Sequence, residues 1–350
     1  MFRGQPQRCK SFISSYIDRL NQLWPFRCLT LLLLGMLGCA SASAQCWVYV
    51  PTHKSNSVSV IRTSQNTVTA VIPVGVQPLS AAISPDGKFV YVTNSGWFFS
   101  NNDVSVIDTN TNTVVSTIPV GRFPVGVAFT PNGQFAYVAN SNSNSVSIIN
   151  TALRAVVATI NVGSGPWGVA FTPNGAFAYV TNQSSNDLSV INTATKTVVA
   201  TLPVGNNPTG VATTPDGAFV YVTNYLSNSV SVVGTSTNTV VNTVAVGTGP
   251  IAIAINSNGT SAYVPNDSGN NVSVISTASN AVVTTIPVQS NPRGVVITPM
   301  GRYVYVSNRV SNTVSVIDTL SNSVVDTAEG VAVFPEAVAI TAIQSGNGCS

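Results

Sequence analysis

A single histidine, His53, limits the chemistry open to this 350-residue chain. Metal or haem sites that need several histidines are excluded, because those ligands are missing. No Gly-x-Ser-x-Gly turn accompanies His53, so a Ser-His-Asp hydrolase is not indicated. Glu329 and Glu336 are the only glutamates, which argues against a hydrolase built on paired glutamates. We therefore predict no catalytic residue, no metal and no cofactor, and expect His53 to lie in a polar loop without a role.

A second set of candidate side chains follows a recurring proline. The prolines are Pro78, Pro124, Pro166, Pro208, Pro250, Pro292 and Pro335. The residues after them are Leu79, Val125, Trp167, Thr209, Ile251, Arg293 and Glu336. Because the residue type changes from copy to copy, packing alone does not determine it, and we expect this position to make specific contacts. Arg293 and Glu336 come from adjacent copies and are expected to pair.

An aromatic run at residues 97–99 lies where one copy is four residues longer than the others. Three aromatic side chains on a loop are costly in water and often mark a contact surface; alternatively, they fold back as a small core of the loop itself. Lys54 is expected on the same face. The candidate binding face comprises Trp97, Phe98, Phe99, Arg122, Phe123, Trp167, Tyr225, Arg293, Arg309 and Glu336.

These side chains are carried by a repeated unit. The motif Tyr-Val-x-Asn starts at Tyr91, Tyr137, Tyr179, Tyr221, Tyr263 and Tyr305, with a degenerate copy at Tyr49. In one copy, strand-like runs at 135–138, 146–149, 155–162 and 168–171 are separated by turns such as residues 131–133, Pro-Asn-Gly. Four strands in about 42 residues are typical of a propeller blade. Seven copies therefore predict an all-β, seven-bladed propeller of four-stranded antiparallel blades over residues 45–350.

The repeats resemble the YVTN family of β-propeller proteins, which includes exported proteins of the YncE type and surface-layer proteins. The resemblance covers about residues 47–343 and is carried by the Tyr-Val-x-Asn copies. It implies a propeller fold and export, and it says little about activity because the motif residues are structural.

Ring closure follows from the order of the strands. The first copy lacks an inner strand, whereas the strand at 337–340 has no outer strands after it. We expect this C-terminal strand to complete the first blade and so remove the free sheet edges. Cys46 and Cys349 flank the joint, and an even pair of cysteines in an oxidising compartment predicts a disulfide between them.

The first 44 residues predict an export signal. Five basic residues precede the apolar run 29–37, and the small residues 42–44 are typical of a cleavage site after Ala44. Cys39 offers an alternative, a lipid-modified cysteine that would hold the protein at a membrane. We expect a periplasmic or cell-surface protein, with no membrane contact other than through the signal or this lipid.

The low content of charged residues limits the classes of molecule that the protein is expected to bind. Only 7% of the residues are charged, far below the usual quarter, and no cluster of Lys and Arg is present that would bind nucleic acid. We therefore expect a monomeric, non-enzymatic binding or scaffold protein for an unknown protein or small molecule. The alternatives are a propeller enzyme of the lyase or lactonase type and an accessory protein of a periplasmic quinoprotein or other redox system.

Overall fold

The structure, a computed structural model, describes residues 46–96 and 102–341. Cys349 and the predicted signal at residues 1–44 lie outside these ranges, and so do Trp97, Phe98 and Phe99. None of the helical structure in the described residues is long and apolar enough to cross a membrane.

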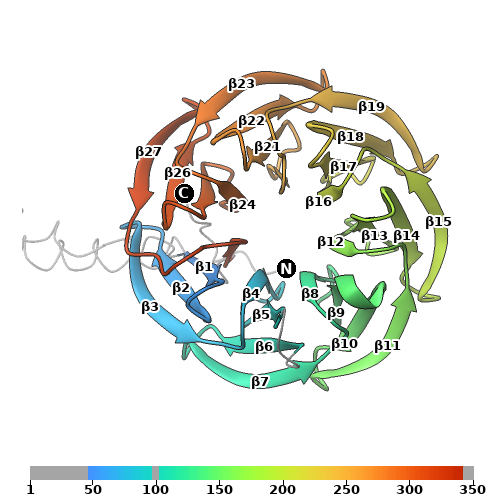
Figure 1. Cartoon of the computed structure of the whole chain (residues 1–350), viewed down its shortest axis with the longest axis horizontal. Coiled ribbons are helices and arrows are strands. Elements are labelled where there is room, and N and C mark those ends of the chain that lie inside the picture. Colours follow the sequence, from blue (N-terminus) through green and yellow to red (C-terminus); the bar gives the residue numbers. More distant parts are fainter. Residues whose placement is uncertain (1–45, 97–101, 342–350) are drawn as a thin grey trace, which may run out of the picture. The chain divides into compact units, whose positions relative to one another are not determined.

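Seven four-stranded antiparallel sheets stand around a central channel like the blades of a propeller (Figure 1). The second blade contains β4 (Pro78–Ile83), β5 (Phe89–Asn94), β6 (Asp103–Asp108) and β7 (Thr113–Pro119). The third contains β8 (Pro124–Phe129), β9 (Phe135–Asn140), the 3-10 turn η1 (Ser141–Ser143), β10 (Ser145–Asn150) and β11 (Ala155–Asn161). The fourth contains β12 (Pro166–Phe171), β13 (Phe177–Asn182), β14 (Asp187–Asn192) and β15 (Thr197–Pro203).

The next three blades repeat this order from the channel outward. The fifth contains β16 (Pro208–Thr213), β17 (Phe219–Asn224), β18 (Ser229–Gly234) and β19 (Thr239–Ala245). The sixth contains β20 (Ala254–Ile255), β21 (Ser261–Asn266), β22 (Asn271–Ser276) and β23 (Ala281–Pro287). The seventh contains β24 (Pro292–Ile297), β25 (Tyr303–Asn308), β26 (Thr313–Asp318) and β27 (Ser323–Ala328). The predicted fold class is confirmed.

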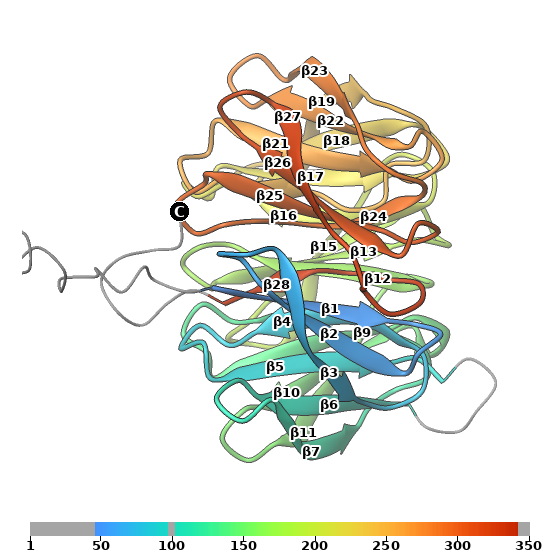
Figure 2. The same cartoon turned by 90° about the vertical axis from the view of Figure 1, so that its left-hand side faces the viewer.

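The first blade is composite, as the sequence predicts. It combines β1 (Trp47–Thr52), β2 (Ser57–Arg62) and β3 (Thr67–Pro73) with the inner strand β28 (Ala339–Ile340) from the C-terminal part of the chain (Figure 2). Two residue pairs join β28 to β1, and a further bridge links Thr52 to Pro335. The ring is thereby closed, with the two ends of the described propeller in a single sheet.

The core lies between the blades. Seven clusters of buried apolar side chains each combine residues from neighbouring blades, within the residues the structure describes. Every tyrosine of the repeated motif is at most 2% exposed. The alternating Val and Ile residues of the two middle strands fill both faces of each sheet, which explains their high content of β-branched residues. The motif therefore builds the packing between blades.

The asparagine of the motif has a structural role, as expected. Its side-chain nitrogen donates to a serine hydroxyl on the third strand of the same blade, at 2.9 Å for Asn94 to Ser105 and for Asn140 to Ser147. The same bond recurs at Asn182, Asn224, Asn266 and Asn308. Because these asparagines are fully buried, their amides are unavailable to a ligand.

Candidate functional site

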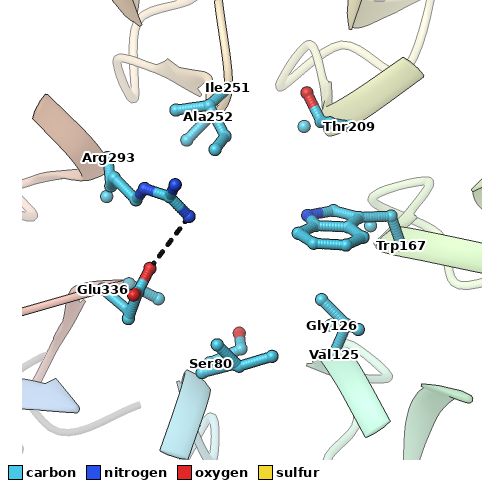
Figure 3. A pocket seen from close by; sticks show the side chains of 14 residues that line it. Ser80, Val125, Gly126, Trp167, Thr209, Ile251, Ala252, Arg293 and Glu336 are labelled. Carbon is cyan, nitrogen blue, oxygen red and sulfur yellow. Dashed lines mark hydrogen bonds and ion pairs between the residues drawn. The ribbon is translucent and has the colours of Figure 1, made fainter. Parts of the chain in front are cut away.

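The residues that follow the recurring prolines meet at the mouth of the central channel. Each blade contributes two successive residues, from its inner strand or from the segment just before that strand, and they line a cavity of about 150 Å³ (Figure 3). The lining residues are Leu79, Ser80, Val125, Gly126, Trp167, Gly168, Thr209, Gly210, Ile251, Ala252, Arg293, Gly294, Glu336 and Ala337. The position that varies most between copies is thus the one that faces the cavity.

Small residues allow the inner strands to approach one another here. A Cβ added to Gly294 would lie 2.6 Å from the carbonyl oxygen of Glu336, and one added to Gly168 would lie 2.5 Å from that of Thr209. Such contacts are not tolerated, so glycine is required where the backbones come this close. This close approach brings the residues at the mouth within reach of one another.

A hydroxyl group then holds neighbouring blades in register. Ser307 Oγ accepts a hydrogen bond from the Gly294 amide at 2.8 Å and donates one to the carbonyl oxygen of Glu336. Thr181 makes the equivalent bonds to Gly168 and Thr209, at 2.8 and 2.7 Å. The third residue of Tyr-Val-x-Asn therefore positions two residues at the mouth.

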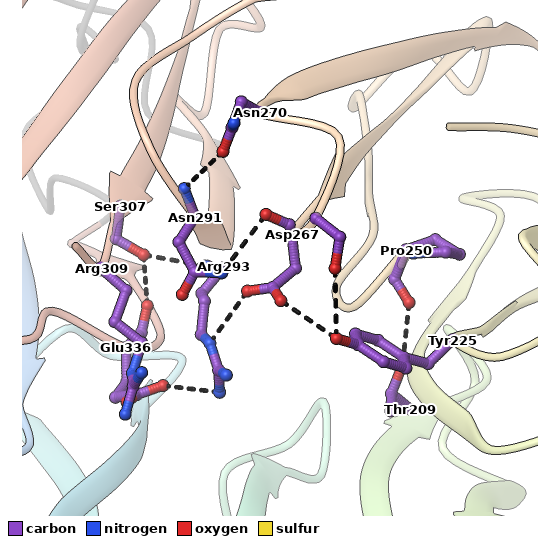
Figure 4. A network of polar contacts seen from close by, with 12 residues as sticks. Thr209, Tyr225, Pro250, Asp267, Asn270, Asn291, Arg293, Ser307, Arg309 and Glu336 are labelled. Atoms are coloured by element: carbon purple, nitrogen blue, oxygen red, sulfur yellow. Dashed lines mark hydrogen bonds and ion pairs between the residues drawn. The ribbon is translucent and has the colours of Figure 1, made fainter. Parts of the chain in front are cut away.

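Charged side chains gather on one side of the mouth (Figure 4). Arg293 contacts Asp267 through Nε and Glu336 through Nη1, both at 3.2 Å, so the predicted pairing of Arg293 with Glu336 is confirmed. Arg309 Nε contacts the second oxygen of Glu336 at 2.7 Å. The side chains of Asp267 and Glu336 are only 5% exposed, and those of Arg293 and Arg309 are 25% exposed. We call these four residues the charged cluster.

Tyr225 extends this network, as its place on the predicted face suggests. Its hydroxyl donates to Asp267 Oδ2 at 3.1 Å, so both carboxylate oxygens of Asp267 are hydrogen-bonded. The side chain of Asn291 also donates to the backbone carbonyl of Asp267, at 3.3 Å. A carboxylate held on several sides is fixed in orientation, and it in turn fixes Arg293.

His53, which we expected in a polar loop without a role, lies close enough to Glu336, Arg309 and Arg293 to interact with them electrostatically. Its backbone amide donates to the carbonyl oxygen of Phe334 at 2.9 Å, and its Nδ1 is buried without a hydrogen-bond partner among the described residues. Burial lowers the pKa of His53; Glu336 acts to raise that pKa, while Arg309, Arg293 and Lys54 lower it. At neutral pH the imidazole is therefore uncharged and able to accept a proton.

Asp267 is a residue that the sequence reasoning missed, and His53 is one that it considered and left without a role. Each directly follows the fourth position of the Tyr-Val-x-Asn motif, as do Tyr225 and Arg309, which were included. This position varies between copies just as the one after the proline does. Comparing it across the repeats would have found both residues.

The opposite side of the mouth is apolar. Trp167 points into the cavity across from Arg293 and Glu336, and Val125 lies on the same side as Trp167 (Figure 3). Two other predicted residues do not line the cavity. Phe123 is only 9% exposed, since it packs at a turn with a positive φ of 55°, and Arg122 is exposed.

No cluster of three or more His, Cys, Asp or Glu side chains suited to a metal ion occurs within residues 46–96 and 102–341. The groups on the charged side of the mouth are the guanidinium groups of Arg293 and Arg309 and the carboxylates of Asp267 and Glu336, with His53 nearby. Such an arrangement can bind a polar group, stabilise negative charge that develops on an oxygen, and accept a proton.

Solved structures with the same fold include proteins that are named for different activities. The chain is 23% identical to the hydrazine synthase of Kuenenia stuttgartiensis, with a TM-score of 0.71 over 77% of this chain and 92% of the other. It is 19% identical to a candidate 6-phosphogluconolactonase from Bacteroides uniformis, with a TM-score of 0.74 over 85% and 100%. A second such candidate, from Bacteroides fragilis, is 20% identical with a TM-score of 0.73 over 87% and 100%. At these identities the likeness establishes the fold alone.

A search of curated proteins finds no match to this chain. The model of the family described as lactonase, 7-bladed β-propeller, matches residues 43–152, 150–285 and 252–340, which together span nearly all of the propeller. The prediction of a non-enzymatic binding or scaffold protein is wrong, because this match favours the enzyme that the sequence left as an alternative. The chain belongs to the lactonase family of seven-bladed β-propellers.

Proposed function

We propose that the protein is a lactonase-type enzyme that hydrolyses a cyclic ester at the channel mouth. The observation that carries this proposal is the charged cluster, whose Arg293 and Glu336 line the cavity with His53 close by. Family membership supports the same activity. The two structurally similar candidate 6-phosphogluconolactonases are named for the hydrolysis of a lactone, which is consistent with this reaction.

The proposed chemistry uses Arg293, which lines the mouth, and His53, which lies near Glu336. A water molecule adds to the lactone carbonyl carbon, and its proton passes to His53, which is uncharged at neutral pH. Arg293 stabilises the negative charge that develops on the carbonyl oxygen. The bond between the carbonyl carbon and the ring oxygen then breaks, and the proton passes from His53 to that oxygen. The product is one hydroxy acid, so the reaction is balanced.

The remaining charged groups position Arg293. Asp267 and Glu336 bind its guanidinium at 3.2 Å each, so it is fixed before any substrate arrives. A donor that needs no rearrangement stabilises a transition state more effectively than a mobile one. Arg309 binds the other oxygen of Glu336 and holds that carboxylate in turn.

The test is a panel of five- and six-membered lactones, with acid release measured in a pH-stat using the purified protein. We expect at least one lactone to be hydrolysed well above the spontaneous rate. His53→Gln should lower kcat by about 10²- to 10⁴-fold, since it removes the proton acceptor. A folded protein that hydrolyses no member of the panel would refute the proposal, and undiminished activity of His53→Gln would refute the role of that residue.

We also propose that residues 1–44 form an export signal cleaved after Ala44, so that residues 45–350 act in the periplasm or at the cell surface, as a monomer. The basic, apolar and small-residue order of this segment supports the proposal, and so does the resemblance of the repeats to the exported YVTN proteins. N-terminal sequencing of the secreted protein tests it, and a mature protein that begins before residue 45 would contradict it.

A further inference from the structure

The mouth has two unlike sides, and each suits a different part of a ligand. Trp167 and Val125 present apolar surface, whereas Arg293 and Glu336 face them from the opposite side (Figure 3). Tryptophan presents a large, flat surface that binds the face of a ring. The apolar side is therefore suited to a flat, weakly polar ring.

The charged side offers no surplus positive charge. Arg293 and Arg309 carry two positive charges, and Asp267 and Glu336 carry two negative ones within 3.2 Å of them, so the charged cluster is neutral. Glu336 is contacted by both arginines and Asp267 by one. The cluster therefore binds a neutral dipole such as a carbonyl group better than an anion.

A phosphate group, unlike a neutral carbonyl group, needs a site with surplus positive charge. It carries roughly −1.5 to −2 charges at neutral pH and is usually bound by Arg or Lys groups that are free to contact it. At this mouth it would meet Asp267 and Glu336 as well as the arginines. The basic residues Lys54 and Arg122 are exposed, and Lys54 lies against the ring of Phe334 at 4.1 Å. The carboxylates of Asp267 and Glu336, which already bind the arginines, disfavour a phosphorylated substrate at the mouth.

We infer, on the basis of the proposed lactonase activity, that the substrate is an uncharged lactone with a flat, apolar ring. That ring lies on the indole of Trp167, and the lactone carbonyl faces Arg293. The cavity of about 150 Å³ is compatible with a compact molecule of one or two rings. The inference separates this protein in substrate class from a 6-phosphogluconolactonase.

Three lactones distinguish these substrate classes. Dihydrocoumarin is uncharged and carries a flat aromatic ring, glucono-δ-lactone is uncharged and polar, and 6-phosphoglucono-δ-lactone is polar and charged. We expect kcat/KM to be highest for dihydrocoumarin and at least about tenfold lower for the phosphorylated lactone, since burying like charges together is unfavourable. A preference for the phosphorylated lactone would overturn the inference while leaving the lactonase activity established.

Substitution of Trp167 tests the apolar side. Trp167→Thr copies the residue that the next blade carries at the same position, Thr209, so the fold has a precedent for it. We expect this variant to raise KM for dihydrocoumarin by about 3- to 10-fold, with a smaller change in kcat. Trp167→Phe should recover part of the loss, and KM for glucono-δ-lactone should change less.

Failure of the inference about the substrate can be distinguished from failure of the proposed lactonase function. An unchanged KM for dihydrocoumarin in Trp167→Thr would overturn the role of the indole and the inference with it. If the folded wild-type protein hydrolyses none of the three lactones or any other of the panel, the proposed function fails as well. Circular dichroism of each variant establishes that the fold is retained.

Discussion

Tyr305 in the seventh blade donates a hydrogen bond of 2.7 Å to Asn66 in the first, across the joint where the ring closes. Four other blades repeat this bond, from Tyr49 to Asn112, Tyr179 to Asn238, Tyr221 to Asn280 and Tyr263 to Asn322. Each asparagine lies at a positive φ near 50°, a conformation that asparagine adopts more easily than most residues. One side chain thus shapes a hairpin and binds it to the preceding blade.

Removal of this bond tests its contribution. We expect Tyr305→Phe to lower the free energy of unfolding by about 1 kcal/mol, since it leaves the buried ring in place and removes one hydrogen bond. Chemical denaturation monitored by fluorescence measures the change. Tyr303→Phe, on the same strand, serves as the control and should have a smaller effect. Equal stability of both variants would contradict the prediction.

Arg293 should be essential for catalysis. We expect Arg293→Met to lower kcat on the best lactone by about 10²- to 10³-fold, because the developing oxyanion loses its donor. Arg302→Met is the matched control, since Arg302 also forms an ion pair, with Asp318 at 2.6 Å, but does not line the mouth. Similar activity of the two variants would argue against a role for Arg293 in the reaction.

The pH dependence of kcat/KM should reflect the protonation of His53. Burial lowers its pKa below 6.5, so the base stays active at mildly acidic pH, and kcat/KM should fall only as the pH passes below the lowered pKa. The same shift affects the free energy of unfolding. As the pH falls, His53 of the unfolded chain is protonated near pH 6.5, before His53 of the folded protein, so the folded protein loses stability until the pH reaches the lowered pKa. Measurements of kcat/KM between pH 4 and 8 test the effect on the rate. His53→Gln should abolish the acidic limb.

Glu336 controls the charge of the mouth. Glu336→Gln removes one negative charge and leaves Arg309 without its carboxylate partner, so the cluster gains a net positive charge. We expect inorganic phosphate to bind about tenfold more tightly to this variant than to the wild-type protein. Isothermal titration calorimetry measures both affinities. If phosphate binds the two proteins equally, the neutrality of the cluster does not determine its selectivity.

The predicted disulfide remains to be tested. Cys46 is fully buried, and Cys349 lies outside the described residues. A bond between them would close a loop of some 300 residues and contribute about 4–5 kcal/mol through chain entropy. We expect reducing agent to lower the Tm, and the mass of a proteolytic peptide pair to reveal the linkage. Two thiols that react without prior reduction would contradict it.

The sequence was sufficient to predict the blades because each copy repeats the same strands, turns and buried tyrosine. It also predicted the pairing of Arg293 with Glu336, which lie at one repeat position in adjacent blades. It could not identify Asp267 as their third partner, because that contact joins two different repeat positions. His53 was dismissed since a lone histidine has no motif; its proximity to Glu336 arises only when the C-terminal segment joins the first blade.

This joint has a consequence for the timing of synthesis. Glu336 lies in the segment between β27 and β28, and it emerges from the ribosome after the second to seventh blades and three strands of the first blade. His53, by contrast, is made near the start of the propeller. A truncated chain that ends before residue 335 lacks both the closing strand and the carboxylate that binds two arginines. The complete charged cluster therefore exists only in a closed ring, and under the proposed function an unfinished chain lacks an intact site.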